Sequence, residues 1–119
     1  MKYTESHEWV NVTDGQGTIG ITSYGQEELG DIVYVELPAV GVELKAGDEA
    51  VVLESTKAAA DLYIPVSGKI VAVNEEVKQD PSILNTHPED QGWLFKVELN
   101  DATELEKLLN EESYRSMLS

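Results

Sequence analysis

The chain has 119 residues, 41% hydrophobic and 26% charged, a composition typical of a single globular domain with its own core. Its formal net charge of −15 argues against nucleic acid or an anionic membrane as a partner and favours docking onto basic protein surfaces. Cysteine is absent, which excludes disulfides, thiolate catalysis and cysteine-ligated zinc and is compatible with a cytoplasmic location. No apolar run is long enough to span a membrane.

The first third of the chain predicts a hairpin, a short helix and a strand. Residues 9–12 and 18–22 are rich in strand formers and flank a glycine-containing turn, which is typical of a β-hairpin. A short helix is expected to follow, with Ser23 as its N-cap and Gly30 as its stop. The alternating side chains of residues 31–37, which end at a proline, predict the next strand.

The middle of the chain predicts a second hairpin with a single lysine at its tip. Residues 51–53 and 63–66 are apolar and rich in strand formers, and the segment between them is too short for a helix. Lys57, followed by three alanines, would therefore be exposed at or near the turn. A strand at 68–73 and a proline-containing loop at 74–92 are expected to follow.

The end of the chain predicts one more strand and a helix. Residues 93–99 are typical of a strand, and Thr103 with Glu106 three residues later forms the pattern of a capping box. Leucines follow at helical spacing, so an amphipathic C-terminal helix is expected over residues 103–118.

An exposed lysine in a tight turn can be a modification site. A long primary amine is suited to forming an amide with a carboxylate-bearing cofactor such as lipoate or biotin, and the small residues after Lys57 leave the approach open. Glu54 and Asp61 flank the amine with carboxylates, which suits recognition by a modifying enzyme. From these residues alone, an ordinary solvated surface charge remains the alternative.

The segment "ESTKAAADLYIPVSG" (54–68) resembles the lipoyl-lysine segment of the glycine cleavage system H protein family. The segments "YTESHEWV" (3–10), "GITSYGQEELGDIVYVELPAVG" (20–41), "VNEEV" (73–77) and "GWLFKVEL" (92–99) resemble other parts of that family in the same order. The departures from the family pattern are small and leave the acceptor lysine unchanged; they are Gly25, Thr56, Ala60 and the segment 88–91.

The resemblance implies a mainly β fold of the lipoyl/biotinyl type, a flattened barrel-sandwich or hammerhead with a short internal helix and a C-terminal α-helix. The expected organisation is a single lipoyl-carrier domain over 1–119, with a β core over about 1–100 and the helix over about 103–118. The implied function is that of a carrier rather than an enzyme: lipoate joined to Lys57 would carry the aminomethyl group of glycine.

The implied partners are the other components of the glycine cleavage system. A pyridoxal-phosphate-dependent glycine decarboxylase would load the arm, and a tetrahydrofolate-dependent aminomethyltransferase would unload it. A dihydrolipoamide dehydrogenase would reoxidise it, and a lipoate-attaching enzyme would modify Lys57. Two other functions stay open. A lipoate-relay protein, which supplies lipoyl groups to other complexes, would need the same lysine, whereas a biotin carrier has Met-Lys-Met where this chain has Thr-Lys-Ala.

The resemblance also assigns roles to five further residues. Ser6, Glu8 and Asp61 match positions that hold the amine of the loaded arm in the family. Their chemistry agrees, since a hydroxyl and two carboxylates can accept hydrogen bonds from an ammonium. In the alternative interpretation, Ser6 caps a turn, Glu8 is solvated and Asp61 serves the lipoylating enzyme. Glu54 and Gly68 match positions linked to recognition by that enzyme. His7 and His87 lie far apart in the sequence without clustered partners, so no metal site is expected.

Overall fold

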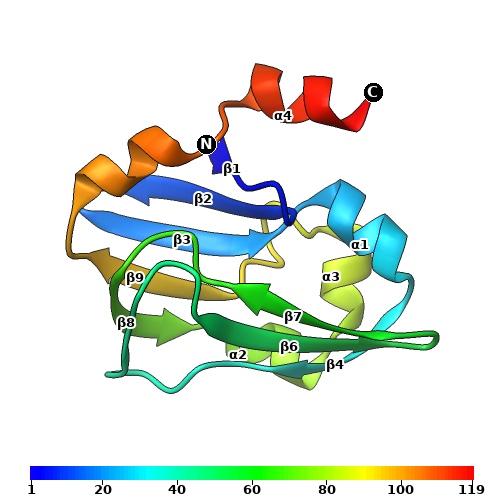
Figure 1. Cartoon of the computed structure of the whole chain (residues 1–119). Coiled ribbons are helices and arrows are strands. Elements are labelled where there is room, and N and C mark those ends of the chain that lie inside the picture. Colours follow the sequence, from blue (N-terminus) through cyan, green and yellow to red (C-terminus); the bar gives the residue numbers. More distant parts are fainter.

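The computed structural model describes all residues from 1 to 119, and its strands form two antiparallel sheets that pack against each other (Figure 1). One sheet has six strands in the order β1-β2-β3-β9-β8-β5, and the other has three in the order β4-β6-β7. In chain order the elements are β1 (Lys2–Tyr3), β2 (Glu8–Thr13), β3 (Gln16–Ile21), α1 (Ser23–Leu29), β4 (Ile32–Glu36), β5 (Glu43–Leu44), β6 (Glu49–Ser55), β7 (Ala59–Tyr63), β8 (Gly68–Val73), α2 (Glu75–Gln79), α3 (Ser82–Thr86), β9 (Phe95–Leu99), η1 (Ala102–Lys107) and α4 (Glu111–Leu118).

A single apolar core joins the two sheets. It contains 17 buried residues between Val10 and Val97, among them Ile19 and Phe95 of the larger sheet and Leu53 of the smaller sheet. β6 and β9 alternate between this core and more exposed positions, whereas Trp9 of β2 packs in a second, smaller cluster with Tyr3 and Tyr114. The expected mainly β, flattened sandwich is therefore confirmed.

The first predicted hairpin is present as β2 and β3. Its two-residue turn consists of Asp14 and Gly15, with φ angles of 52° and 78°. A two-residue turn with positive φ at both positions matches the right-handed twist of the flanking strands, and glycine adopts that conformation without strain. The preceding strand β1, only two residues long, carried no recognisable sequence pattern.

The short helix α1 forms as expected, but its cap differs from the prediction. Thr22, and not Ser23, is the N-cap, because its hydroxyl accepts a hydrogen bond from the N–H of Gly25 at 3.1 Å. Adjacent threonine and serine are both good caps, and the buried position of Thr22 decides between them. Gly30 ends the helix with φ at 93°, as predicted.

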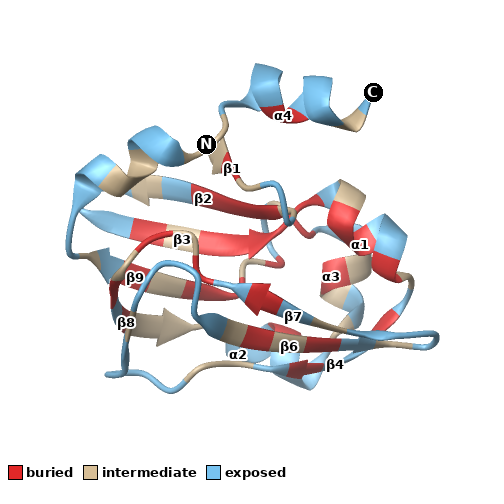
Figure 2. Cartoon of the chain, in the orientation of Figure 1, coloured by how far each residue is buried: buried red, intermediate tan, exposed pale blue.

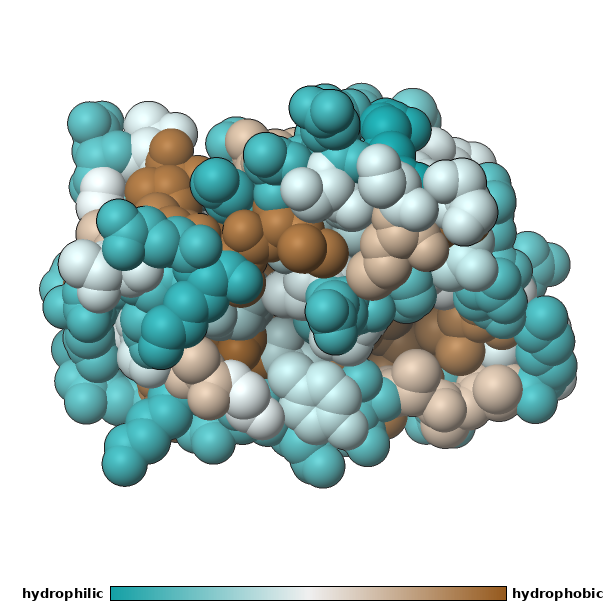
Figure 3. Space-filling view, turned by 45° about the horizontal axis from the view of Figure 1, so that its top comes forward, coloured by the Kyte–Doolittle hydropathy of each residue, from teal (hydrophilic) through white to brown (hydrophobic).

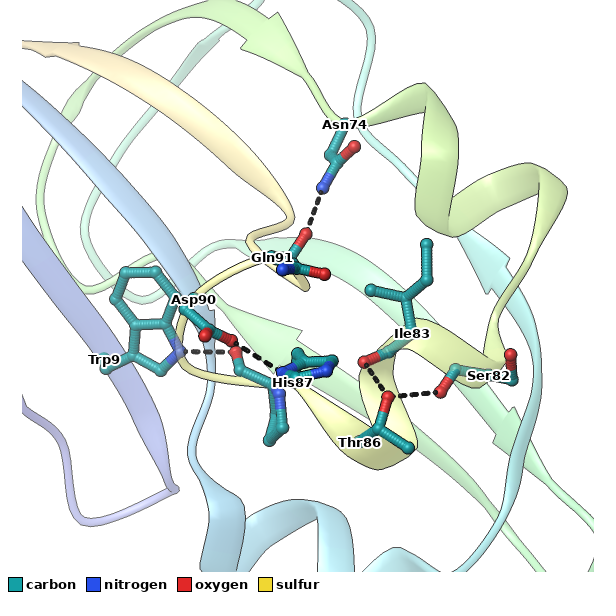
Figure 4. Close-up of polar contacts among 9 residues, drawn as sticks. Trp9, Asn74, Ser82, Ile83, Thr86, His87, Asp90 and Gln91 are labelled. Carbon is teal, nitrogen blue, oxygen red and sulfur yellow. Dashed lines mark hydrogen bonds and ion pairs between the residues drawn. The ribbon is translucent and has the colours of Figure 1, made fainter.

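The segment 74–92, predicted as a loop, contains the short helices α2 and α3. Asn74 caps α2 by accepting from the N–H of Glu76, and its amide donates to the carbonyls of Gln91 and Trp93 at 3.0 and 2.7 Å. Figure 4 shows the contact with Gln91 and, beside it, the indole of Trp9 donating to the Pro88 carbonyl at 3.0 Å. Two five-residue helices are too short for their periodicity to be read from sequence, and these tertiary contacts hold them in place.

The prediction of one continuous C-terminal helix over 103–118 is wrong, because the structure has two separate helices there. The structure has a 3-10 helix capped by Asp101, then an extended break, and then α4 capped by Asn110. The break exists because Leu109 forms a β-bridge with Tyr3, with two backbone hydrogen bonds of 2.8 Å. That pairing needs extended backbone and so interrupts the helical pattern. Tyr114 of α4 then stacks on Tyr3, with ring centroids 4.7 Å apart.

The tip of the β6–β7 hairpin is exposed (Figure 2). On the face drawn in Figure 3, hydrophilic residues dominate, and apolar residues show only in separate patches. None of the helices has the length and apolar character needed to cross a membrane.

Candidate functional site

Lys57 lies at the tip of the hairpin formed by β6 and β7, as the sequence predicted. The two strands pair antiparallel up to Glu54, which lies opposite Ala59, so only the residues from Ser55 to Ala58 form the turn. Lys57 and the two alanines that follow it are exposed. Figure 1 shows this hairpin extending past α1 and α3, so that its tip is reachable from several sides.

The side chain of Ser55 closes this turn. Its hydroxyl accepts hydrogen bonds from the N–H groups of Lys57 and Ala58, at 3.2 and 2.9 Å, and donates to the Ala58 carbonyl at 3.1 Å. The Ser55 N–H also donates to the Ala58 carbonyl at 2.7 Å. Serine commonly organises turns in this way. Sequence analysis missed this residue, although its position before the lysine was a usable signal. The Ser55 side chain thereby holds the backbone of Lys57 in the turn.

The hairpin tip is attached to the C-terminal end of α1. The N–H of Thr56 donates to the carbonyl of Asp31 at 3.0 Å. Asn85 of α3 holds the same region, because its side-chain oxygen accepts from the N–H of Ile32 and from the amide of Gln26, at 2.9 and 3.2 Å. These contacts fix the tip relative to α1 and thus relative to the groove described next.

A groove with a volume of about 230 Å³ lies between α1 and β7. It joins two residues that the sequence singled out, Ser6 and Asp61, with Glu28 and His7, which sequence analysis did not assign to the site. Apolar side chains form the remainder of its wall, and the full set is Ser6, His7, Ile21, Gly25, Glu28, Leu29, Ala60, Asp61 and Leu62. Two other cavities, of about 310 and 450 Å³, lie near β1 and the C-terminal segments, and neither contains a residue of the lysine hairpin.

Glu8 lies behind Ser6 and does not line the groove. Its side chain is 1% exposed, and its carboxylate accepts hydrogen bonds from the hydroxyls of Thr4 and Ser6 and from the N–H of Tyr63. The contact with Tyr63 joins β2 of the larger sheet to β7 of the smaller one. Ser6, which is exposed, therefore connects the buried carboxylate to the groove.

The two predicted recognition residues, Glu54 and Gly68, lie in different sheets. Glu54 is exposed in β6, directly before the turn that holds Lys57. Gly68 is buried at the start of β8 in the other sheet, where a Cβ atom would lie 2.1 Å from the carbonyl oxygen of Glu98 and 2.5 Å from a methyl group of Val97. The backbone of β9 thus approaches Gly68 too closely for any side chain, which gives this glycine a packing role.

A hydrogen-bonded chain links α4 to the edge of the groove. The Tyr114 hydroxyl lies 2.8 Å from Nδ1 of His7 and 2.8 Å from the hydroxyl of Thr22, which caps α1. Burial raises the pKa of the Tyr114 hydroxyl, although the hydrogen bond with Thr22 opposes that rise. The C-terminal helix therefore helps to position His7, whose backbone has an uncommon φ of 73°.

The fold and this site define a class: a flattened β-sandwich that displays one lysine on a closed hairpin turn beside a groove. The sequence model of the family described as glycine cleavage H-protein matches residues 1–119. A glycine cleavage system H protein of Thermotoga maritima is 54% identical over 114 residues, which cover 96% of this chain and 92% of that protein. One from Carboxydothermus hydrogenoformans is 52% identical, covering 99% and 91%.

The structural comparison agrees. The crystal structure of a glycine cleavage system H protein from Mycobacterium marinum matches with a TM-score of 0.91 and 38% identity, covering 98% of this chain and 94% of that one. The chain belongs to the glycine cleavage H-protein family. The family expected from the sequence is thereby confirmed, and with it the expected carrier function in glycine cleavage.

Proposed function

We propose that Lys57 is the residue that carries lipoate, as an amide on its side-chain nitrogen, and that the arm so formed carries the aminomethyl group of glycine. One observation supports this most directly. Lys57 is exposed on a turn closed by Ser55, and the groove that contains Ser6 and Asp61 lies beside the same hairpin. In this proposal, residues 1–119 act as a single carrier domain located in the cytoplasm.

The residues present fit a lipoyl group. Lys57 has no ion-pair partner, and its neighbours Ala58 and Ala59 leave the approach to its amine open. Bound lipoate would supply a disulfide that is reduced as it accepts the aminomethyl group. The chain's own part is to hold the turn rigid, to keep the amine reachable, and to offer a groove in which Ser6 and Asp61 can accept hydrogen bonds from a cationic cargo.

The proposed partners follow from the carrier function. They are a pyridoxal-phosphate-dependent glycine decarboxylase, a tetrahydrofolate-dependent aminomethyltransferase, a dihydrolipoamide dehydrogenase and the enzyme that attaches lipoate. Tethering the cargo to one arm replaces diffusive encounters with a high effective concentration. The net charge of −15 favours partners with basic docking surfaces. Glu54, directly before the turn, is the better placed of the two proposed recognition residues, because Gly68 is buried in the other sheet.

The experiment that tests this function treats the protein with a lipoate ligase and maps the modified peptide by mass spectrometry. The lipoylated protein is then supplied to a glycine decarboxylase, and the exchange of labelled bicarbonate into glycine is measured. We expect one lipoyl group, on the peptide that contains Lys57, and exchange that depends on it. Lipoylation at Lys57 without any exchange would favour a lipoate-relay function, and label elsewhere would contradict the assignment.

The groove itself leads to a prediction for its two carboxylates. Asp61→Asn and Glu28→Gln should each speed the spontaneous release of formaldehyde and ammonia from the aminomethyl-loaded protein. Both side chains are exposed, so each contact with the ammonium is partly screened, and we expect an increase of about two- to fivefold that shrinks at high salt. The matched control is Glu27→Gln, which removes the same charge from the same helix outside the groove. Equal release rates in all four proteins would contradict a carboxylate contact with the cargo.

A further inference from the structure

Gly30, the residue that ends α1, adopts a backbone conformation that is nearly restricted to glycine. Its φ and ψ are 93° and −164°. Its N–H donates to the carbonyl of Gln26 at 2.9 Å, and its carbonyl accepts from the Gln26 side-chain amide at 3.2 Å. A residue with a side chain would be strained at these angles. These backbone angles explain why a glycine ends α1. A separate contact, with the side chain of Lys57, lies over the same residue.

The side chain of Lys57 passes over Gly30. A Cβ atom at position 30 would lie 3.0 Å from Cε of Lys57 and 3.6 Å from both Cδ and Cγ. The methylene chain of the lysine therefore lies so close to Gly30 that a side chain there would push its Cε aside by a few tenths of an ångström. This contact is made by the segment of the lysine directly below the nitrogen to which a cargo arm would be joined.

The position of Gly30 relates this contact to the groove. The two residues before it, Glu28 and Leu29, line one side of the groove, and Ala60 and Asp61 of the hairpin line the other. Thr56 is hydrogen-bonded to Asp31 and Ser55 pairs with Ile32, so the residues directly before the lysine are held against the segment that follows α1. The lysine chain that lies on Gly30 is therefore next to the residue that follows Leu29 of the groove wall.

We propose that Gly30 is a positioning residue for the arm: its missing side chain lets the methylenes of Lys57 lie against the end of α1 and starts the arm along the groove. This inference rests on the proposed carrier function for its role in cargo protection, but the contact itself exists in the unmodified protein. Ordering several torsions of the lysine in advance lowers the entropy lost when the loaded end enters the groove. An arm that leaves the turn in random directions lacks that advantage.

The first test needs no substitution and no lipoate. In unmodified, isotope-labelled protein, we expect nuclear Overhauser effects between the Cε protons of Lys57 and the Cα protons of Gly30. We also expect a higher order parameter at Cε of Lys57 than at Cε of Lys78, which is exposed on α2. If Lys57 is as mobile as Lys78 and shows no such contact, the proposal is wrong, whatever the fate of the carrier function.

The second test substitutes Gly30 and uses as its control another glycine with nearly the same φ angle. Gly30→Ala places a methyl group 3.0 Å from Cε of Lys57, which must then move away, so it should weaken the contact and lower the Lys57 order parameter toward that of Lys78. Gly47→Ala places alanine at a φ of 95° with no atom within 4 Å of its methyl group, so it reproduces the positive φ without the contact. Its Lys57 should behave as in wild type.

The cargo measurement completes the test. In lipoylated, aminomethyl-loaded protein, Gly30→Ala should release formaldehyde and ammonia about fivefold faster than wild type, while Gly47→Ala releases them at the wild-type rate. A release rate in Gly30→Ala equal to that of the control would overturn the positioning role. Should Gly30→Ala fail to fold, the contact and order parameters of the wild type still decide whether the lysine lies on Gly30.

Discussion

Replacing Lys57 with arginine is expected to abolish lipoylation and leave the free energy of unfolding within about 0.5 kcal/mol of wild type. Arginine keeps the positive charge and the long apolar stem, but its guanidinium stays protonated and cannot form the amide. Lys57 is exposed and makes no side-chain hydrogen bond or ion pair, so the fold does not depend on its amine. Intact mass after treatment with a lipoate ligase, together with thermal unfolding, measures both effects.

Two further variants make this result specific. Lys69→Arg changes an exposed lysine of β8 that is not in a turn, and it should be lipoylated as fast as wild type. Glu54→Ala, which removes the carboxylate directly before the turn, should slow lipoylation without abolishing it. A lipoyl group found on Lys57→Arg would contradict Lys57 as the acceptor, and an unchanged rate in Glu54→Ala would remove Glu54 from the recognition surface.

The strands and the lysine hairpin could be predicted from the sequence because their signals are local. Runs of strand formers identify β2, β3 and β6, alternating side chains identify β4, and the turn at Asp14 and Gly15 is recognisable from two adjacent residues. The exposure of Lys57 follows from its position between two short apolar runs. Ser6 and Asp61, which the family resemblance paired, do meet in one groove.

The remaining features depend on contacts between distant segments. The break in the C-terminal helix comes from the pairing of Leu109 with Tyr3, more than 100 residues away in the chain, and no local pattern contains it. Glu28 reaches the site only because α1 packs beside β7, so its sequence position on a short helix carried no sign of function. Glu8 was expected from the resemblance to contact the amine of the loaded arm, and its burial behind Ser6, with a donor from β7, could not be read from the sequence.

Glu8→Ala is expected to lower the free energy of unfolding by roughly 3 kcal/mol, which makes it the substitution with the largest effect on stability. The carboxylate is 1% exposed and accepts from Thr4, Ser6 and the N–H of Tyr63. The two hydroxyls can turn toward other acceptors. The N–H of Tyr63 cannot, so the loss of its acceptor adds to the cost of the cavity left by the buried side chain. Chemical denaturation followed by tryptophan fluorescence measures the loss.

The matched control is Glu5→Ala, which removes the same charge from an exposed neighbour in the same segment and should change stability by less than about 0.5 kcal/mol. Glu8→Gln should fall between the two, because its amide keeps the volume and can still offer one oxygen to Tyr63. A Glu8→Ala protein as stable as Glu5→Ala would show that the buried hydrogen bonds contribute little.

If the loss is as large as expected, faster cargo release in a Glu8 variant would reflect a displaced Ser6 and a loosened β2–β7 contact. Asp61, exposed in the groove, is then the residue whose substitution tests cargo binding without disturbing the fold.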